Sequence, residues 1–231
     1  MTRASKPYAV RVRIDEILAG LAEGDSVPPE RELATRFGVS RETVRQALQE
    51  LFVEGRIERR GRGTVVARPK LVQQLSLRSY TEGAAKQGRT PGRLLVGWET
   101  CPASAEHAAA LNIPEGAEVM HLERVLLADH QHIGLESTYL PASRFGRLRE
   151  TFEPATSLYE AIQDCGVDFG SAVERIETAL PSPREAELLE TSTSRPMLLL
   201  TRRSVDTAGA PIELVRALYR GDRIAFETVL T

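Results

Sequence analysis

The sequence predicts an α+β protein with two domains: a small N-terminal one of helices with a two-stranded wing, and a larger one built on a mainly antiparallel sheet with helices. Three observations point to this class. Between Ser26 and Ala67, two segments with apolar residues at helical spacing precede a glycine-rich hairpin. After residue 70, apolar runs of strand length alternate with short helical segments. Between these parts, residues 67–77 start polar and contain a proline, which indicates a linker.

Charge is distributed unevenly along the 231 residues. The chain has 30 Lys and Arg against 32 Asp and Glu; residues 1–70 hold 14 and 10 of these, which leaves 16 and 22 for the rest. Only the N-terminal part therefore suits a polyanion such as nucleic acid, although a solvated surface explains the same excess. We place the domains at residues 1–69 and 80–231, with the linker over residues 70–79.

The first domain is expected to contain three helices. The first starts at Tyr8 and ends before Gly24, with apolar residues at helical spacing. The second should begin at Pro29, because proline is favoured at a first helical position, and close at Gly38. The third follows Ser40, a good N-cap residue. Its apolar stripe consists of Val44, Ala47, Leu48 and Leu51.

Basic side chains surround one end of this third helix. Arg41 projects from its first turn and Arg45 lies on the flank of the apolar stripe, so this end can face a groove. Two short runs follow, residues 56–60 and 64–67, and the Gly-Arg-Gly between them suits a tight hairpin. The segment thus has the order helix, turn, helix and wing.

The motifs VPPERELA, GVSRETVRQAL and RRGRGTVVA resemble the winged helix-turn-helix domain of GntR-family bacterial transcription regulators. Pro29 is a departure, because the family commonly has serine there. The resemblance implies a double-stranded DNA partner. The implied DNA contacts are Arg31, Ser40, Arg41, Thr43, Arg45, Arg62 and Gly63, with the wing in the minor groove. An ion pair with a neighbouring glutamate is the alternative explanation for Arg31.

The second domain is expected to repeat one order of elements, a strand, a helix and two strands. The predicted strands are Leu94–Thr100, Glu118–Ala128, Ile133–Leu140, Val173–Leu180, Met197–Val205 and Ile212–Tyr219. The predicted helices are Ser104–Leu111, Ser157–Asp164 and Pro183–Glu190. Short turns between successive strands favour antiparallel pairing.

Five motifs in this half are similar to the effector-binding domain of the HutC subfamily of GntR regulators, which is related in fold to chorismate lyase. They are TEGAAKQGRTPG, LERVLLAD, LESTYLP, SLYEAI and PIELVRALYRGDRIAF. The resemblance implies a small-molecule effector, with a sugar phosphate as one candidate. The implied effector-binding residues are Thr90, Arg124, Glu136, Ser157, Tyr159, Glu213 and Tyr219.

Each implied role has a physical basis and an alternative. Arg124 would neutralise an anionic ligand, and Glu136 and Glu213 would accept hydrogen bonds from its hydroxyl or amine groups. Ser157 would start a helix that faces the ligand. Arg124 and Glu136 lie on adjacent predicted strands, so they can equally pair with each other. Phosphosugar-type relatives often have a second arginine where Leu126 stands, so a less anionic ligand is also open.

Other chemistry is not expected. Cys101 and Cys165 have no metal-binding or disulfide spacing, and His130 with His132 lacks a clear third ligand, so we predict neither a metal nor another cofactor. No apolar run reaches the length of a membrane span, which predicts a cytoplasmic protein.

Together these observations predict a homodimeric, ligand-responsive transcription regulator, most simply a repressor that a metabolite releases from a palindromic operator. The alternative class is an enzyme of chorismate-lyase-like fold with an attached DNA-binding module. Against it, the sequence offers no nucleophile and base pair, metal cluster or cofactor loop, and a fold does not by itself carry an activity. A non-specific chromosome-binding protein would not need the second domain.

Overall fold

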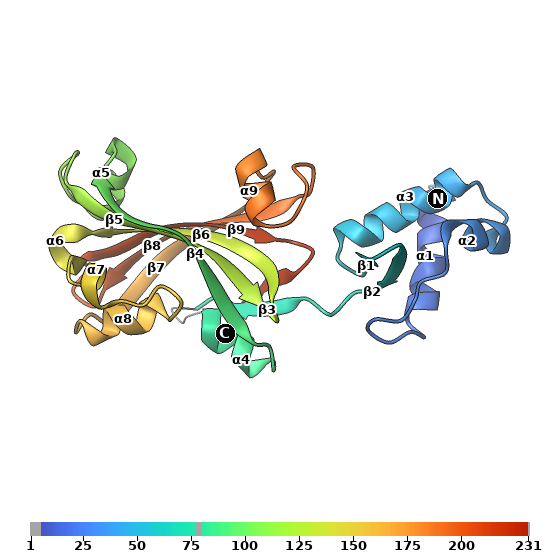
Figure 1. The fold of residues 1–231 in the computed structure, drawn as a ribbon, viewed down its shortest axis with the longest axis horizontal. Helices are drawn as coiled ribbons and strands as arrows, with labels where there is room; N and C mark the ends of the chain where they lie inside the picture. The colour runs from blue at the N-terminus through green and yellow to red at the C-terminus, as the bar shows by residue number, and fades with distance from the viewer. Residues whose placement is uncertain (1–5, 77–79, 231) are drawn as a thin grey trace. The chain divides into compact units, whose positions relative to one another are not determined.

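The computed structural model describes residues 6–76 and 80–230, which form two compact units (Figure 1). The first unit contains the residues up to Lys70 together with Gly221–Arg223, and the second contains Leu71–Arg220 and the segment from Ile224 onward. The first unit is helical with a small hairpin, and the second is built on a large antiparallel sheet. The predicted α+β class is therefore confirmed.

Three helices pack around one apolar core in the first unit: α1 (Lys6–Leu18), α2 (Glu30–Phe37) and α3 (Arg41–Val53). The predicted apolar stripe of α3 is buried in this core. Ser40 caps α3, because its side chain accepts a hydrogen bond from the Thr43 amide. Gly38 ends α2 with a φ of 67°, a left-handed value that glycine adopts without strain.

One predicted helix start is wrong. Pro29 has an extended backbone, with φ −68° and ψ 155°, and therefore precedes α2 as its N-cap residue. The helix begins at Glu30 instead, which places Glu30 and Glu32 in the first turn, where a negative charge is favoured.

The wing consists of strands β1 (Ile57–Arg60) and β2 (Gly63–Val66), paired antiparallel with Arg60 opposite Gly63. Its two-residue loop starts at Gly61, whose φ of 59° suits a tight hairpin turn. An isolated bridge between Ser26 and Val65 ties the hairpin to the segment before α2. The predicted hairpin is thus present.

The sheet of the second unit has the strand order β4-β5-β6-β9-β8-β7, with every neighbouring pair antiparallel. Its strands are β4 (Pro91–Pro102), β5 (Glu118–Ala128), β6 (Gln131–Pro141), β7 (Phe169–Ala179), β8 (Met197–Asp206) and β9 (Pro211–Arg220). The repeated order of elements appears as two halves, β4-α5-β5-β6 and β7-α9-β8-β9, joined by the central pairing of β6 with β9.

Both faces of this sheet are covered. Helices α5 (Ala105–Leu111) and α9 (Pro183–Leu188) lie on one face, drawn uppermost in Figure 1. The opposite face carries α4 (Tyr80–Lys86), α6 (Ala142–Phe145), α7 (Leu148–Thr151), α8 (Leu158–Asp164) and a pair of short strands. Coverage on both sides explains why β5 and β9 are buried along almost their whole length and do not alternate between buried and exposed residues.

The short strands correct the predicted linker. Residues 71–74, inside the expected linker 70–79, form β3 (Leu71–Gln74), which pairs in parallel with β10 (Ile224–Glu227). Leu71 is buried in the second unit, so this segment is part of that fold. Residues 77–79 of the expected linker lie outside the described residues.

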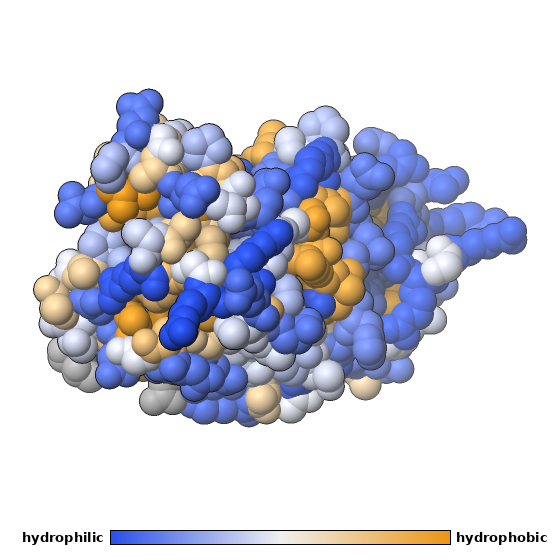
Figure 2. All heavy atoms as spheres, turned by 60° about the vertical axis from the view of Figure 1, so that its left-hand side comes forward, coloured by the Kyte–Doolittle hydropathy of each residue, from blue (hydrophilic) through white to orange (hydrophobic). Residues whose placement is uncertain are grey.

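The surface of the described residues is mainly hydrophilic on the face that Figure 2 shows. On the face drawn in Figure 2, hydrophilic side chains predominate and apolar ones gather in separate small patches. Among the described residues, no helix is both long and apolar enough to cross a bilayer.

The core of the first unit yields a stability prediction. Leu51 is fully buried in α3, so Leu51→Ala should lower the free energy of unfolding of this unit by about 2–5 kcal/mol through lost burial and a residual cavity. Val53, on the same helix, is 39% exposed, and Val53→Ala is the matched control with an effect below about 1 kcal/mol. Urea unfolding followed by circular dichroism measures both. Equal losses in the two variants would contradict the assigned core.

Candidate functional sites

The predicted DNA contacts gather at the N-terminal end of α3 and at the tip of the wing. The Ser40 and Thr43 hydroxyls lie 2.8 Å apart at the start of α3, beside the exposed side chain of Arg41. Arg62 and Gly63 are exposed at the hairpin tip. Hydroxyls, guanidinium groups and the backbone amides of a helix start can all bond to phosphate oxygens, and arginine also pairs with guanine.

Ion pairs at this surface differ from the sequence expectation. Arg45 binds Glu30 at 3.1 Å and Glu42 at 3.0 Å, and Arg41 lies 3.9 Å from Glu30. The hydrogen bond with Glu30 raises the pKa of the exposed Arg45 guanidinium. Arg31, for which an ion pair was the alternative, has no carboxylate in salt-bridge contact among the residues described. Glu30 and Glu42 therefore pair with the arginines of α3, and a DNA contact through either arginine would require an exchange of partners.

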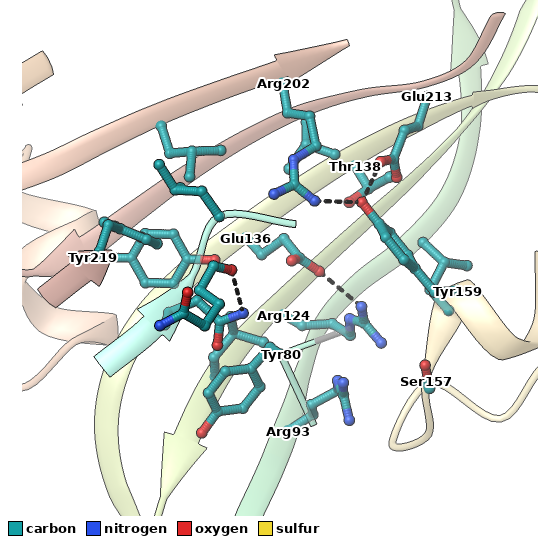
Figure 3. Close-up of a pocket in the computed structure, with 18 residues that line it drawn as sticks. Tyr80, Arg93, Arg124, Glu136, Thr138, Ser157, Tyr159, Arg202, Glu213 and Tyr219 are labelled. Carbon is teal, nitrogen blue, oxygen red and sulfur yellow. Dashed lines mark hydrogen bonds and ion pairs between the residues drawn. The ribbon is translucent and has the colours of Figure 1, made fainter. Parts of the chain in front are cut away.

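A cavity with a volume of about 60 Å³ lies beside the sheet of the second unit (Figure 3). This is several times the roughly 10–15 Å³ that one water molecule needs. Six of the seven predicted effector-binding residues line it: Arg124, Glu136, Ser157, Tyr159, Glu213 and Tyr219. They come from β5, β6, α8 with its N-cap, and β9, which are far apart in sequence. The fold thus brings the predicted residues together.

Thr90 is the seventh predicted residue, and it is not among the described residues that line the cavity. It lies next to the first residue of β4, where its amide donates to the Asp129 carboxylate at 2.8 Å and its carbonyl accepts from the Asp129 amide at 2.9 Å. Asp129 has a φ of 50° at the β5–β6 turn. In this structure Thr90 therefore fixes that turn.

Arg124 is 3% exposed and uses its guanidinium to hold three partners. Nη2 pairs with Glu136 Oε1 at 2.7 Å, directly across the β5–β6 ladder, so the cross-strand pair that the sequence left open is present. Nη1 donates to the carbonyls of Pro154 and Thr156, at 3.2 and 3.0 Å. Both carbonyls belong to the loop before α8, so Arg124 positions the start of that helix.

Tyr159, on α8, joins Arg202 and Glu213, two further charged residues of the cavity lining. Its hydroxyl donates to Glu213 Oε1 at 2.7 Å and accepts from Arg202 Nη1 at 2.8 Å. Burial raises the pKa of Tyr159 well above its ordinary value, which keeps the hydroxyl protonated. Glu213 Oε1 also accepts from the Ser204 hydroxyl at 2.8 Å, and Arg202 binds Glu174 at 2.9 Å. This network connects α8 with β7, β8 and β9.

The carboxylate of Glu213 has capacity left for a ligand. It is fully buried, and burial raises its pKa. Oε2 has no hydrogen-bond partner among the described residues, and the same is true of three other buried lining atoms. These are Gln73 Oε1, Arg93 Nε and Arg124 Nε. An unpaired buried polar atom costs about 1–3 kcal/mol, and four residues that carry such atoms line this one cavity, which favours a polar ligand site.

Several lining residues were missed by sequence reasoning: Gln73, Gln74, Tyr80, Arg93, Thr138 and Arg202. Arg202 lies in a predicted strand, where an arginine two positions after the buried Leu200 was a usable signal for an inward-facing charge. The two glutamines lie on β3, which the sequence assigned to the linker. Tyr219, which was predicted, packs edge-on against Phe226 of β10, with ring centroids 5.2 Å apart.

His130 lies in the β5–β6 turn, and His132 lies near the start of β6. His130 has a φ of 65°, and the ring nitrogen Nδ1 of His132 is 2.8 Å from the Leu188 carbonyl. Within residues 6–76 and 80–230, no three metal-binding side chains gather at one point.

Comparison with known proteins gives both units a family. Residues 10–66 match the family described as bacterial regulatory proteins, gntR family, and residues 86–225 match the UTRA domain. The HTH-type transcriptional repressor PhnF of Mycolicibacterium smegmatis is 50% identical over 228 residues, which cover 99% of this chain and 93% of that protein. The repressor NagR of Bacillus subtilis is 35% identical over 203 residues, or 87% and 83% of the two chains.

A solved structure agrees along nearly the whole length. The crystal structure of PhnF from Mycobacterium smegmatis superposes with a TM-score of 0.73 at 50% identity, covering 96% of this chain and 99% of that one. The protein therefore belongs to the GntR family of bacterial transcription regulators, in the HutC subfamily whose second domain is an effector-binding UTRA domain.

Proposed function

We propose that this regulator is a homodimeric repressor that leaves a palindromic operator when a small polar metabolite binds in the cavity of the second unit. The observation that carries this proposal is the cavity itself, lined by Glu213, Arg93 and Arg124, whose buried atoms Oε2, Nε and Nε have no hydrogen-bond partner among the described residues. A metabolite that donates to the carboxylate and accepts from the guanidinium groups satisfies these atoms. Binding, with no chemical step, is sufficient for this role, so we propose no enzymatic activity.

Each unit takes one task in this proposal. Residues 1–69 form the DNA-binding domain, with Arg31, Arg41, Thr43 and Arg45 at the operator, Ser40 and Arg62 on the phosphate backbone, and Gly63 in the minor groove. The second unit, which includes β3 and the segment from Ile224 onward, binds the effector and joins the two copies. The protein acts where the chromosome lies, in the bacterial cytoplasm. That PhnF and NagR are named repressors supports the proposed sign of regulation.

The edge strand β7 supports the dimer. It is the outermost strand of the sheet beyond β8, and Val173 on it is 65% exposed. Exposed apolar side chains on an unpaired strand are costly in an isolated chain and favourable when a second copy covers them. A two-fold dimer presents two α3 helices, which suit two symmetric half-sites.

The dimer prediction is tested by light scattering. The free protein should have twice the chain mass and bind a palindrome whose half-sites are about one helical turn apart. Val173→Asp should shift the mass towards the monomer, because it adds two charges to the proposed interface. Asp168→Ala, a change at an exposed site just before β7, is the control. A wild-type protein that is monomeric both free and on DNA would reject the dimer.

The two kinds of arginine should behave differently on DNA. Arg45→Ala should weaken operator binding by roughly 1–3 kcal/mol and leave random DNA less affected, since a base contact is lost. It also leaves Glu30 and Glu42 facing DNA without their partner. Arg62→Ala should weaken binding to operator and random DNA alike. It should also reduce the slope of log affinity against log salt concentration by about one. Fluorescence anisotropy over a salt series measures this, and equal losses on both DNAs for Arg45→Ala would make it a phosphate contact.

The effector role requires reciprocal coupling between ligand and operator. A thermal-shift screen with sugar phosphates, amino acids and their breakdown products should first find a stabilising ligand. That ligand should then weaken operator binding by about 5- to 150-fold, the usual range of coupling. Tyr159→Phe removes the hydroxyl between Arg202 and Glu213 and should lower the response. Arg147→Ala, at an exposed position away from the cavity, should keep it. If no stabilising ligand alters operator affinity, the cavity is not an effector site.

A further inference from the structure

The guanidinium of Arg45 is held by two carboxylates that come from different helices. Glu30, the first residue of α2, accepts from Nε at 3.4 Å through Oε1 and from Nη2 at 3.1 Å through Oε2. Glu42, in the first turn of α3, accepts from Nη1 at 3.0 Å. Glu30 therefore occupies one edge of the guanidinium with both of its oxygens, whereas Glu42 uses a single oxygen.

The two carboxylates differ in how firmly the protein holds them. The Glu42 side chain is 78% exposed, and it contacts Arg45 within one helix. The Glu30 side chain is 20% exposed and also lies 3.9 Å from Nη2 of Arg41. Pro29, whose ring fixes φ, directly precedes Glu30. Water or DNA can therefore replace Glu42 more readily than Glu30.

The contact with Glu30 leaves one edge of Arg45 available for a base. A guanidinium carries five N–H donors, and Glu30 uses two of them, on Nε and Nη2. Replacement of Glu42 frees Nη1, so that each Nη nitrogen then has a donor that points away from Glu30. Two such donors match the O6 and N7 acceptors of guanine in the major groove. Arg45 can thus pair with a guanine and with Glu30 at the same time.

The negative charge of Glu30 affects a phosphate contact more than a base contact. Attraction to phosphates is independent of sequence and depends on the net charge of the protein surface. A guanidinium that is paired with a carboxylate adds little to this charge. Hydrogen bonds to guanine depend instead on the direction of the donors, which Glu30 fixes. The carboxylate therefore lowers the affinity for DNA of any sequence while it preserves the contact with one base.

We propose that Glu30 is a positioning residue for operator recognition, which directs Arg45 towards a guanine and reduces the attraction of Arg45 to phosphates. In this role Glu30 raises the ratio of the affinity for the operator to the affinity for unrelated DNA. The inference rests on the proposed base contact of Arg45. Stability does not account for the pair, because ion pairs at a protein surface contribute little to it.

The test compares the binding of the full-length protein to two duplexes. One is a palindrome that the wild type selects from a random-sequence library, and the other is a shuffled duplex of the same composition. Fluorescence anisotropy over a salt series gives both affinities and their salt dependence. Glu30→Gln should strengthen binding to the shuffled duplex by roughly three- to ten-fold and steepen its slope of log affinity against log salt concentration by about one. Binding to the selected palindrome should gain less, so the ratio of the two affinities should fall.

Glu32→Gln is the matched control, because it removes the same charge from the same turn of α2. Within the described residues, Glu32 is exposed and is not one of the carboxylates that pair with the arginines of α3. The general loss of repulsion should strengthen binding to both duplexes alike in this variant, which leaves the ratio unchanged. A ratio that falls equally in the two variants, or that stays constant in both, would overturn the positioning role.

Combination with Arg45→Ala shows whether Glu30 acts through Arg45. In that background, Glu30→Gln should change the two affinities as Glu32→Gln does, because no guanidinium remains to be directed. If the ratio still falls as much as it does when Arg45 is present, Glu30 acts on DNA directly and the inference fails.

Arg45→Ala alone keeps this result separate from the proposed function. If that variant loses affinity mainly for the selected palindrome while Glu30→Gln leaves the ratio unchanged, Arg45 reads a base without the help of Glu30, and only this inference fails. If the wild type selects no palindrome from the library, the proposed operator binding fails as well.

Discussion

The position of α8, and with it the shape of the cavity, depends on the buried guanidinium of Arg124. A charge at this depth is costly unless paired, and Arg124 is paired with Glu136 and with the carbonyls of Pro154 and Thr156. These contacts fix the loop that leads into α8. Tyr159, one turn further, then reaches Glu213 and the opposite half of the sheet. One guanidinium thus organises groups from both halves of the second unit.

Much of the fold follows from local sequence signals, because most elements carry their own periodicity and caps. The strands β5 and β9 and the capped helices α3 and α9 are examples. What the sequence could not reveal are contacts between distant segments. The strand β3 pairs with β10, about 150 residues away, and has no alternating pattern of its own. A strand of this kind resembles a linker until its partner is known.

The candidate sites show the same limit at the level of side chains. The family resemblance identified seven effector-binding residues, such as Glu213, from residue types that relatives share. Six of these seven residues line one cavity. The resemblance missed Arg93, which the fold brings to the cavity from β4. The general frequency of surface ion pairs offered such a pair as the alternative for Arg31, whereas Glu30 pairs with Arg45 instead. A helical wheel gives the directions of side chains around a single helix axis, whereas this ion pair joins residues of α2 and α3.

The pairing of β3 with β10 has a consequence for the position of the cavity along the chain. The backbone passes between the two units after Lys70, after Arg220 and after Arg223, and β3 and β10 begin at two of these crossings. Gln73 and Phe226, on these strands, line the cavity. Gln73 is three residues beyond Lys70, where the first unit ends. The lining of the cavity therefore begins within three residues of the point where the chain leaves the first unit.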